Sequence, residues 1–339
     1  MKCIKLKGVR NLEIATVKKP NSKDGSVIIR VKCCGICGSD LHYFENGSPL
    51  ELIMGHEFSG VVVDPGDRLD LEVGDRVTGL PISPCLKCDA CKNGNIHFCK
   101  NTWTDAVGLS LTNSGGFSEY LSCRSDMVKK IPNKVSFQEA TLVEPSAVSL
   151  HAINLANIKV GDKVLIIGGG IIGLMAAEFA RLNGATYVAL METNIKRSKK
   201  AMKYGKISEV FNANDKDIIE KVMKKTSGGF DKVIECCGNQ YAVSEAIMSV
   251  KEGGSIILVG VATNNISVPI TMSVMKEVEM KGAIAYTEKE FETCIKLIEK
   301  GVIDVLKYID LKVNLDKVQD AFLELTSGKT DKIKIIVKP

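Results

Sequence analysis

The segment from Lys163 to Glu192 constrains the fold of this chain more than any other. It reads KVLIIGGGIIGLMAAEFARLNGATYVALME, which predicts a strand, a glycine turn, a helix that ends at Gly184 and a second strand. Further buried-type strands, DKVIECCG and GGSIILVG, follow with helical stretches between them. Strands that alternate with helices predict an α/β fold with a doubly wound parallel sheet.

The glycine turn predicts a dinucleotide site. Gly168, Gly170 and Gly173 form the pattern G-x-G-x-x-G between strand and helix. The first glycine allows a tight turn, the second lets the backbone approach a pyrophosphate, and the third lets the helix pack against the strand. The helix then begins at Ile171 and Ile172, and its N-terminus favours the charge of a phosphate.

Glu192 indicates which dinucleotide is bound. It ends the strand that follows the helix, where an acid accepts the ribose hydroxyls of the adenosine and repels a 2′-phosphate. We therefore expect NAD rather than NADP. The alternative is an ordinary solvated acid at a strand end. Lys196 and Arg197 lie close by in the sequence, which leaves room for some NADP tolerance.

Composition narrows the class of protein. The chain has 339 residues, 45% hydrophobic and 25% charged, with a net charge of +5. This length suits two domains, and the balance is that of a soluble globular protein. The chain has no long run of Lys and Arg, so its charge gives no reason to expect nucleic-acid binding. The N-terminus has no apolar stretch as long as the core of a signal peptide, and no apolar segment is long enough to span a membrane. We therefore expect a cytoplasmic protein with reduced thiols.

Four cysteines lie in one short polar segment, SPCLKCDACKNGNIHFCK. They are Cys85, Cys88, Cys91 and Cys99, with the spacing C-x2-C-x2-C-x7-C. A disulfide knot and a metal site both fit such a cluster, and reduced thiols favour the metal. An iron–sulfur run of this kind closes after three residues with Cys-Pro. Here the gap is seven and Lys100 follows. We predict a closed structural zinc site, with an iron–sulfur cluster and redox pairs as alternatives.

Cys37 and His56 predict a second metal site. They occur in CGICGSDLHYF and MGHEFSG, and the chain has only four histidines. Thiolate and imidazole are the ligand types that zinc prefers. Alone, either residue would more often belong to the core or the surface. Together with the four-cysteine segment and the dinucleotide fold, they favour zinc.

These motifs, in this order, resemble those of the zinc-dependent medium-chain dehydrogenases over essentially the whole chain. The resemblance rests on GICGSD, GHEFSG, the four cysteines, GGFSEY, VEPSAVSLHA, VLIIGGGIIGL and ECCG. It implies a GroES-like β-barrel catalytic domain from residues 1–147 and 286–339, and a Rossmann NAD-binding domain at 148–285. We expect further cofactor contacts at Arg197, Cys236, Val259 and Gly260.

The resemblance also assigns the ligands of the catalytic zinc. Cys37 and His56 match two of them, and Glu57 matches an acid that binds or lies near the metal. Glu144 stands where alcohol dehydrogenases of the family often carry a cysteine. A glutamate in place of that cysteine is similar to the sorbitol, butanediol and sugar-alcohol-phosphate branch. Whether Glu57 or Glu144 coordinates, while the other holds a metal-bound water, stays open. In the alternative, Glu144 only caps the helix that carries His151.

The resemblance also implies two residues that would carry the proton away from the substrate. Ser39 matches the serine that hydrogen-bonds the reacting hydroxyl, and His42 matches a histidine that ends a proton relay. A surface imidazole is the alternative for His42. Ala285 stands where sorbitol dehydrogenases carry an arginine near the substrate, which argues against specificity for sorbitol itself.

The expected protein is therefore an NAD- and zinc-dependent dehydrogenase with one catalytic and one structural zinc. It would oxidise a secondary alcohol of a polyol, diol or sugar-alcohol phosphate to a ketone. We expect a small-molecule alcohol as partner, no nucleic acid, no membrane, and a homotetramer or homodimer. A threonine-type amino-alcohol dehydrogenase and a non-catalytic NAD-binding redox sensor are the alternatives.

Overall fold

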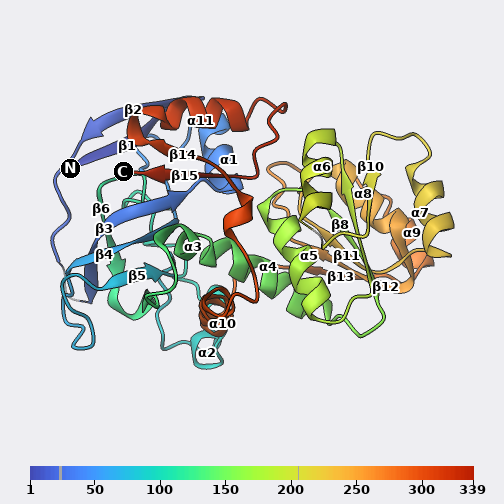
Figure 1. Ribbon diagram of the computed structural model, residues 1–339, viewed down its shortest axis with the longest axis horizontal. Helices are drawn as coiled ribbons and strands as arrows, with labels where there is room; N and C mark the ends of the chain where they lie inside the picture. The colour runs from blue at the N-terminus through green and yellow to red at the C-terminus, as the bar shows by residue number, and fades with distance from the viewer. Residues whose placement is uncertain (23–24, 205) are drawn as a thin grey trace. The chain divides into compact units, whose positions relative to one another are not determined.

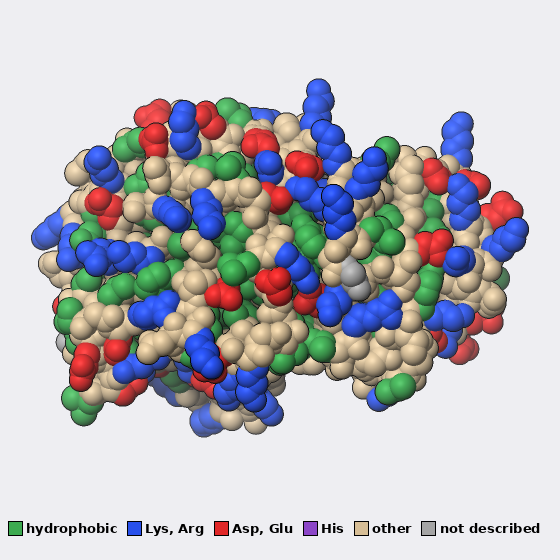
Figure 2. Space-filling view, in the orientation of Figure 1, with side chains coloured by type: hydrophobic (Ala, Val, Ile, Leu, Met, Phe, Trp, Pro, Cys, Tyr) green, Lys and Arg blue, Asp and Glu red, His purple; other side chains and the backbone are tan. Residues whose placement is uncertain are grey.

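The computed structural model describes residues 1–22, 25–204 and 206–339. The chain divides into two compact units, Met1–Glu144 with Thr287–Pro339, and Pro145–Tyr286. The sequence places the corresponding boundaries after residues 147 and 285. Within the described ranges, no helix is long and apolar enough to cross a membrane. On the face shown in Figure 2, basic side chains are mixed with acidic ones over both units.

The unit Pro145–Tyr286 is built on a six-stranded parallel sheet with the order β10-β9-β8-β11-β12-β13. This is the doubly wound sheet that the alternation of strands and helices predicted (Figure 1). Its strands are β8 (Lys163–Ile167), β9 (Tyr187–Glu192), β10 (Glu209–Asn212), β11 (Phe230–Glu235), β12 (Val250–Leu258) and β13 (Glu279–Gly282). Its helices are α5 (Ile171–Leu182), α6 (Ile195–Lys203), α7 (Ile218–Thr226), α8 (Gln240–Ser249) and α9 (Ile270–Met275).

Successive side chains of β8 point to opposite faces of this sheet, because a strand alternates with a period of two. Leu165 and Ile167 pack in one core with residues of α7 and α8. Ile166 faces α5, where a Cβ on Gly173 would lie 3.0 Å from its side chain and 2.0 Å from the carbonyl oxygen of Gly168. Gly173 therefore permits the close packing of helix on strand that the glycine pattern predicted.

The other unit contains a largely antiparallel sheet with the order β14-β15-β3-β4-β5-β7, and β6 pairs with β3. A separate two-stranded sheet is formed by β1 and β2. The strands are β1 (Lys2–Gly8), β2 (Asn11–Thr16), β3 (Ser26–Gly35), β4 (Glu57–Asp64), β5 (Arg76–Gly79), β6 (Tyr120–Arg124), β7 (Val128–Lys130), β14 (Ile309–Asn314) and β15 (Lys334–Lys338). The helices are α1 (Gly38–Asn46), α2 (Asp89–Lys92), α3 (Phe137–Thr141), α10 (Glu288–Glu299) and α11 (Val318–Leu325), and α4 (Val143–Ala156) crosses the boundary between the units.

The last strand of the chain lies beside a strand from the first part of the chain in this sheet. The C-terminal strand β15 runs antiparallel to β3, with Ile336 opposite Gly35, and Gly35 also lies opposite Glu57 of β4. Figure 1 shows the red C-terminal strands beside the blue N-terminal ones. The first residue of β15, Lys334, is thereby brought next to residues that are distant from it in the sequence.

Candidate functional site

Cys37, His56 and Glu57 come together in space. One ligand atom of each lies within 4.8 Å of the others, with His56 and Glu57 buried and Cys37 half-buried. Cys37 is the residue before α1, and Glu57 begins β4 directly after His56. Zinc binds a thiolate, an imidazole and a carboxylate at about 2.0–2.3 Å, so its ligand atoms lie roughly 3–4 Å apart. The three residues therefore fit one zinc ion, and three protein ligands leave a position for a substrate.

Asp40 supports two of these ligands and was missed by the sequence analysis. It is fully buried. Its Oδ2 accepts a hydrogen bond from the backbone N–H of Cys37 at 3.0 Å, and its Oδ1 lies 3.5 Å from Nδ1 of His56. A carboxylate at one ring nitrogen orients the other nitrogen toward a metal. Asp40 is the third residue of the helix that follows Cys37, but Cys-x-x-Asp is not the usual S/T-x-x-E/Q pattern of a capping box, so no sequence signal marked it.

Lys334 is the second residue that the sequence analysis missed. Its Nζ lies 2.8 Å from Oε1 and 2.7 Å from Oε2 of Glu57, and it donates to the carbonyl oxygen of Ile36 at 2.9 Å. Lys334 is 1% exposed and Glu57 0%. Gly35 leaves the space that the carboxylate needs, because a Cβ there would lie 1.9 Å from Oε2 of Glu57.

Glu144 is buried at the start of α4. Burial lowers the pKa of Lys334, but the charges of Glu57, Cys37 and Glu144 outweigh this and raise it, so Lys334 is an ammonium ion. The structure thus groups Glu57, and not Glu144, with Cys37 and His56 among the described residues, while Glu144 is near enough to act on Lys334. The role of Glu144 at the metal stays a prediction.

Ser39 and His42 lie on α1, in the helix that Cys37 begins. Both side chains are half-buried. They therefore lie on the helix that directly follows Cys37 and are not enclosed by the core. Their roles in a proton path stay predictions.

The four cysteines form a second metal-binding group. The sulfur atoms of Cys85, Cys88, Cys91 and Cys99 lie within 4.8 Å of one another. The sulfur atoms of Cys88 and Cys91 are 3.5 Å apart, much longer than the bond of about 2.05 Å in a disulfide, and all twelve cysteines are free. Four sulfurs at about 2.3 Å from a zinc ion would lie roughly 3.8 Å apart. The set fits a closed zinc site.

Backbone N–H groups donate hydrogen bonds to two of these sulfurs, those of Cys85 and Cys99. Cys99 Sγ accepts hydrogen bonds from the N–H groups of Cys85 at 3.3 Å and Asn101 at 3.4 Å. The N–H groups of Lys87 and Cys88 lower the pKa of the Cys85 thiol to about 6. The thiolate is the form that binds zinc, so the local backbone favours the ligand form of Cys85 at neutral pH.

The predicted dinucleotide residues lie at the carboxyl edge of the parallel sheet. Oε2 of Glu192 accepts a hydrogen bond from the N–H of Gly169 at 2.7 Å, and Oε1 accepts from the N–H of Asn194 at 2.8 Å. Glu192 is therefore not an ordinary solvated acid, since it is 8% exposed and joins the glycine turn to the start of α6. Arg197 lies on α6, and Cys236, Val259 and Gly260 follow the ends of β11 and β12.

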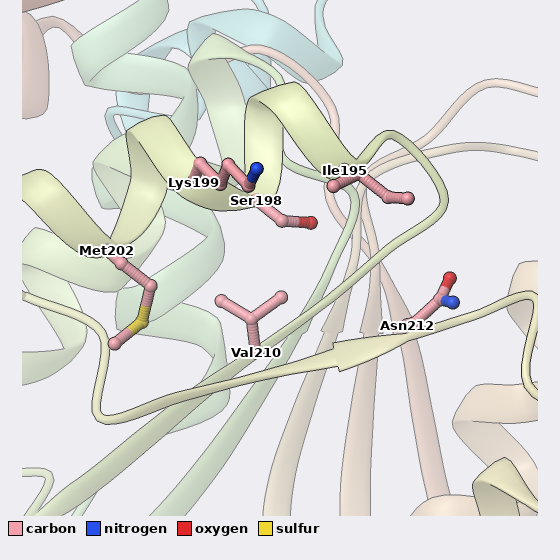
Figure 3. Close-up of a pocket in the computed structure, with 6 residues that line it drawn as sticks. All are labelled: Ile195, Ser198, Lys199, Met202, Val210 and Asn212. Atoms are coloured by element: carbon pink, nitrogen blue, oxygen red, sulfur yellow. The ribbon is translucent and has the colours of Figure 1, made fainter.

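A hollow of about 240 Å³ lies between α6 and the edge strand β10 (Figure 3). None of the described residues that line it was predicted to bind cofactor or metal. The lining residues are Ile195, Ser198, Lys199, Met202, Val210 and Asn212.

The metal-binding groups of one unit and the glycine turn of the other define a class of protein, a two-zinc dehydrogenase with a dinucleotide fold. Comparison with known proteins shows the family. The alcohol dehydrogenase GroES-like domain matches residues 23–133, and the zinc-binding dehydrogenase domain matches residues 172–300. The chain belongs to the zinc-dependent medium-chain dehydrogenases, as the motifs indicated, and it is an oxidoreductase.

Several relatives align over the full chain. Sorbitol dehydrogenase of Bacillus subtilis (strain 168) is 30% identical, with 100% of this chain and 97% of the relative covered. (R,R)-butanediol dehydrogenase of the same strain is 32% identical, with 100% of each covered. Among solved structures, a zinc-binding dehydrogenase from Sinorhizobium meliloti 1021 bound to NADP has a TM-score of 0.90 and 29% identity, covering 100% of this chain and 99% of that one.

Proposed function

We propose that the protein uses NAD to oxidise a secondary alcohol of a polyol, diol or sugar-alcohol phosphate to a ketone. The observation that carries this is the group of Cys37, His56 and Glu57, held on one side by Asp40 and on the other by Lys334. The likeness to sorbitol and butanediol dehydrogenases supports the substrate class.

The chain's own residues divide the work at this site. Zinc, when bound, supplies a Lewis acid that stabilises an alkoxide. Cys37, His56 and Glu57 would hold it, and Asp40 fixes the imidazole ring of His56. The hydroxyl of Ser39 is placed on the helix beside Cys37 to accept a proton, with His42 one turn further along. The hydride chemistry belongs to the nicotinamide.

We propose NAD as the preferred cofactor because of Glu192. A buried carboxylate at the end of β9 presents a negative charge where NADP would carry its 2′-phosphate. The NADP-bound structure of a relative indicates that members of this family can also bind the other dinucleotide. In this chain, Arg197 on α6 is the positive side chain that would pair with the 2′-phosphate of NADP.

We also propose that copies of the chain associate, as a homotetramer or homodimer. Strand β13 ends its sheet, pairing there only with β12 among the described strands, and such edges pair readily with another chain. On α9, Val274 and Met275 are each 72% exposed. Val274→Lys should reduce the molar mass measured by light scattering, and an unchanged mass would remove this surface from the interface.

The location proposed is the cytoplasm. All twelve cysteines are free thiols, and such a number of reduced thiols suits a reducing compartment. Localisation of a tagged protein by cell fractionation would test this.

The substrate test is a screen of NAD reduction. Purified protein would be offered polyols, their phosphates, vicinal diols and threonine, with absorbance of NADH as the readout. We expect turnover with a polyol, a polyol phosphate or a diol. Turnover with threonine alone would favour the amino-alcohol alternative, and NADH binding without turnover of any alcohol would favour a redox sensor.

A further inference from the structure

Glu235 is a fully buried acid at the centre of the parallel sheet. It is the last residue of β11, between β8 and β12, and is 0% exposed. It therefore lies at the carboxyl edge, where sheets of this type bind dinucleotides. Its Oε1 accepts hydrogen bonds from the N–H groups of Cys237 at 2.6 Å and Gly238 at 2.8 Å.

The side chain of Glu235 holds the loop at residues 237 and 238, and its main chain holds another loop at residues 259 and 260. Its carbonyl oxygen accepts from the N–H groups of Val259 at 2.8 Å and Gly260 at 3.1 Å. The side chain thus binds residues 237 and 238, and the backbone binds residues 259 and 260. Two of the cofactor contacts expected from the resemblance, Val259 and Gly260, are held by this carbonyl oxygen, which any residue type at position 235 would supply.

The two loops touch each other and the glycine turn. A Cβ on Gly260 would lie 2.0 Å from the N atom of Gly238, and a Cβ on Gly168 would lie 2.6 Å from Sγ of Cys237. The N–H of Cys236 donates to the carbonyl oxygen of Ile167 at 2.9 Å. Because these contacts are so close, a shift of the loop at Cys237 would displace both the glycine turn at Gly168 and the loop at Gly260.

The second oxygen of Glu235 is the unusual feature. Oε2 is buried and has no hydrogen-bond partner among the described residues. An unpaired buried oxygen costs free energy, and a position that served packing alone would not require it. Burial raises the pKa of Glu235, against the N–H groups of Gly238, Cys237 and Gly260, which lower it.

We propose that Glu235 is a positioning residue for the dinucleotide, which aligns the glycine turn and the loops at 236–238 and 259–260. The inference rests on the proposed NAD-dependent function. Glu235 is enclosed and does not itself touch the cofactor. Its removal should therefore weaken dinucleotide binding and leave the zinc ligands at Cys37 and His56 unaffected.

The test compares Glu235→Asn with Glu235→Gln, which differ by one methylene. Gln keeps an oxygen within reach of both N–H groups, and Asn withdraws it. We expect NADH to bind about tenfold more weakly to Glu235→Asn and within roughly threefold of wild type to Glu235→Gln, because only the Asn variant leaves the loop at residues 237 and 238 without the acceptor that holds it. Fluorescence titration of NADH measures this directly.

The control is Asp231→Ala, which removes an acceptor at the opposite end of the same strand. Oδ2 of Asp231 also accepts a backbone N–H, that of Lys163, at 2.7 Å. This variant should lose stability without any change in NADH affinity. In Glu235→Asn, the KM for NAD should rise while zinc content and the KM for the alcohol stay at the wild-type values. A general loss of structure would not separate these readouts.

Two failures are distinguishable. Wild type that binds neither NADH nor NADPH would overturn the proposed function. Folded Glu235→Asn that binds NADH as tightly as wild type would overturn only the role of Glu235. Glu235→Asp withdraws the oxygen in the same way and answers the question if the Asn variant does not fold.

Discussion

Lys334 and Glu57 form an ion pair that is almost completely removed from solvent. The ammonium nitrogen contacts both carboxylate oxygens, at 2.7 and 2.8 Å, while the same carboxylate lies beside Cys37 and His56. The last strand of the chain is thereby joined to the metal-binding group. In the absence of the metal, Lys334 is the positive charge beside the carboxylate of Glu57 and near the sulfur of Cys37.

We predict that Lys334→Met destabilises the zinc-free protein by about 3–5 kcal/mol, because without the metal it leaves Glu57 as a buried, unpaired charge. Denaturant unfolding measures this free energy. Adding Glu57→Gln to Lys334→Met should recover much of the loss, since no uncompensated charge then remains. A Lys334→Met protein as stable as wild type would show that the pair is not buried as described.

Gly35→Ala is predicted to disturb the same pair from its other side. The new methyl group would overlap Oε2 of Glu57, at 1.9 Å, and overpacking of this kind costs about 1–3 kcal/mol. Gly38→Ala is the matched control, because a Cβ there meets nothing within 4 Å. Zinc content and melting temperature should fall for Gly35→Ala and stay near wild type for Gly38→Ala. Equal behaviour of the two variants would contradict the close contact.

Metal analysis should find about two zinc ions per chain, one in each group. Cys91→Ala should lose the zinc of the four-cysteine group and lower stability, because structural zinc contributes folding free energy. Cys37→Ala should lose the other zinc and the activity, with the fold largely intact. One zinc in wild type, or iron with visible absorbance, would overturn the assignment.

Local patterns made much of the fold and site predictable. The glycine turn, the four cysteines, and the neighbours His56 and Glu57 each lie within short stretches of sequence, where spacing alone carries the chemistry. Lys334 was not predictable in this way, because 277 positions separate it from Glu57. A buried lysine near a chain end has no sequence signature, since only the pairing of β15 with β3 brings it to its partner.

Asp40 and Glu235 illustrate a second limit. Each acid looks like a surface residue in the sequence, yet both are 0% exposed. Their partners are mostly backbone N–H groups, and any residue type supplies such a group. The sequence therefore does not reveal what an acid at either position binds.

Glu192 should control the choice between the two dinucleotides. Glu192→Gln keeps an oxygen for the N–H of Gly169 and removes the charge, together with the acceptor for the N–H of Asn194. We predict that the ratio of kcat/KM for NADP to that for NAD rises about tenfold, or ~1.4 kcal/mol, because a repulsive element is lost. Glu192→Ala should also weaken both cofactors, since Gly169 loses its acceptor. If wild type already prefers NADP, the role given to Glu192 is wrong.

Glu144 is the other acid that was predicted at the metal-binding group. Its charge acts on Lys334, and the carboxylate is buried at the start of α4. If it binds zinc or holds a water there, Glu144→Gln should lower turnover by about 10–100-fold. NADH affinity should be unchanged, because the cofactor's adenosine half is expected at Gly168–Gly173 and Glu192. Steady-state turnover at saturating NAD, paired with zinc content, is the measurement.

If Glu144 only caps α4, Glu144→Gln should change turnover very little. Near-normal turnover with full zinc would remove Glu144 from the site, and with it a main sequence feature that favours a polyol or diol substrate.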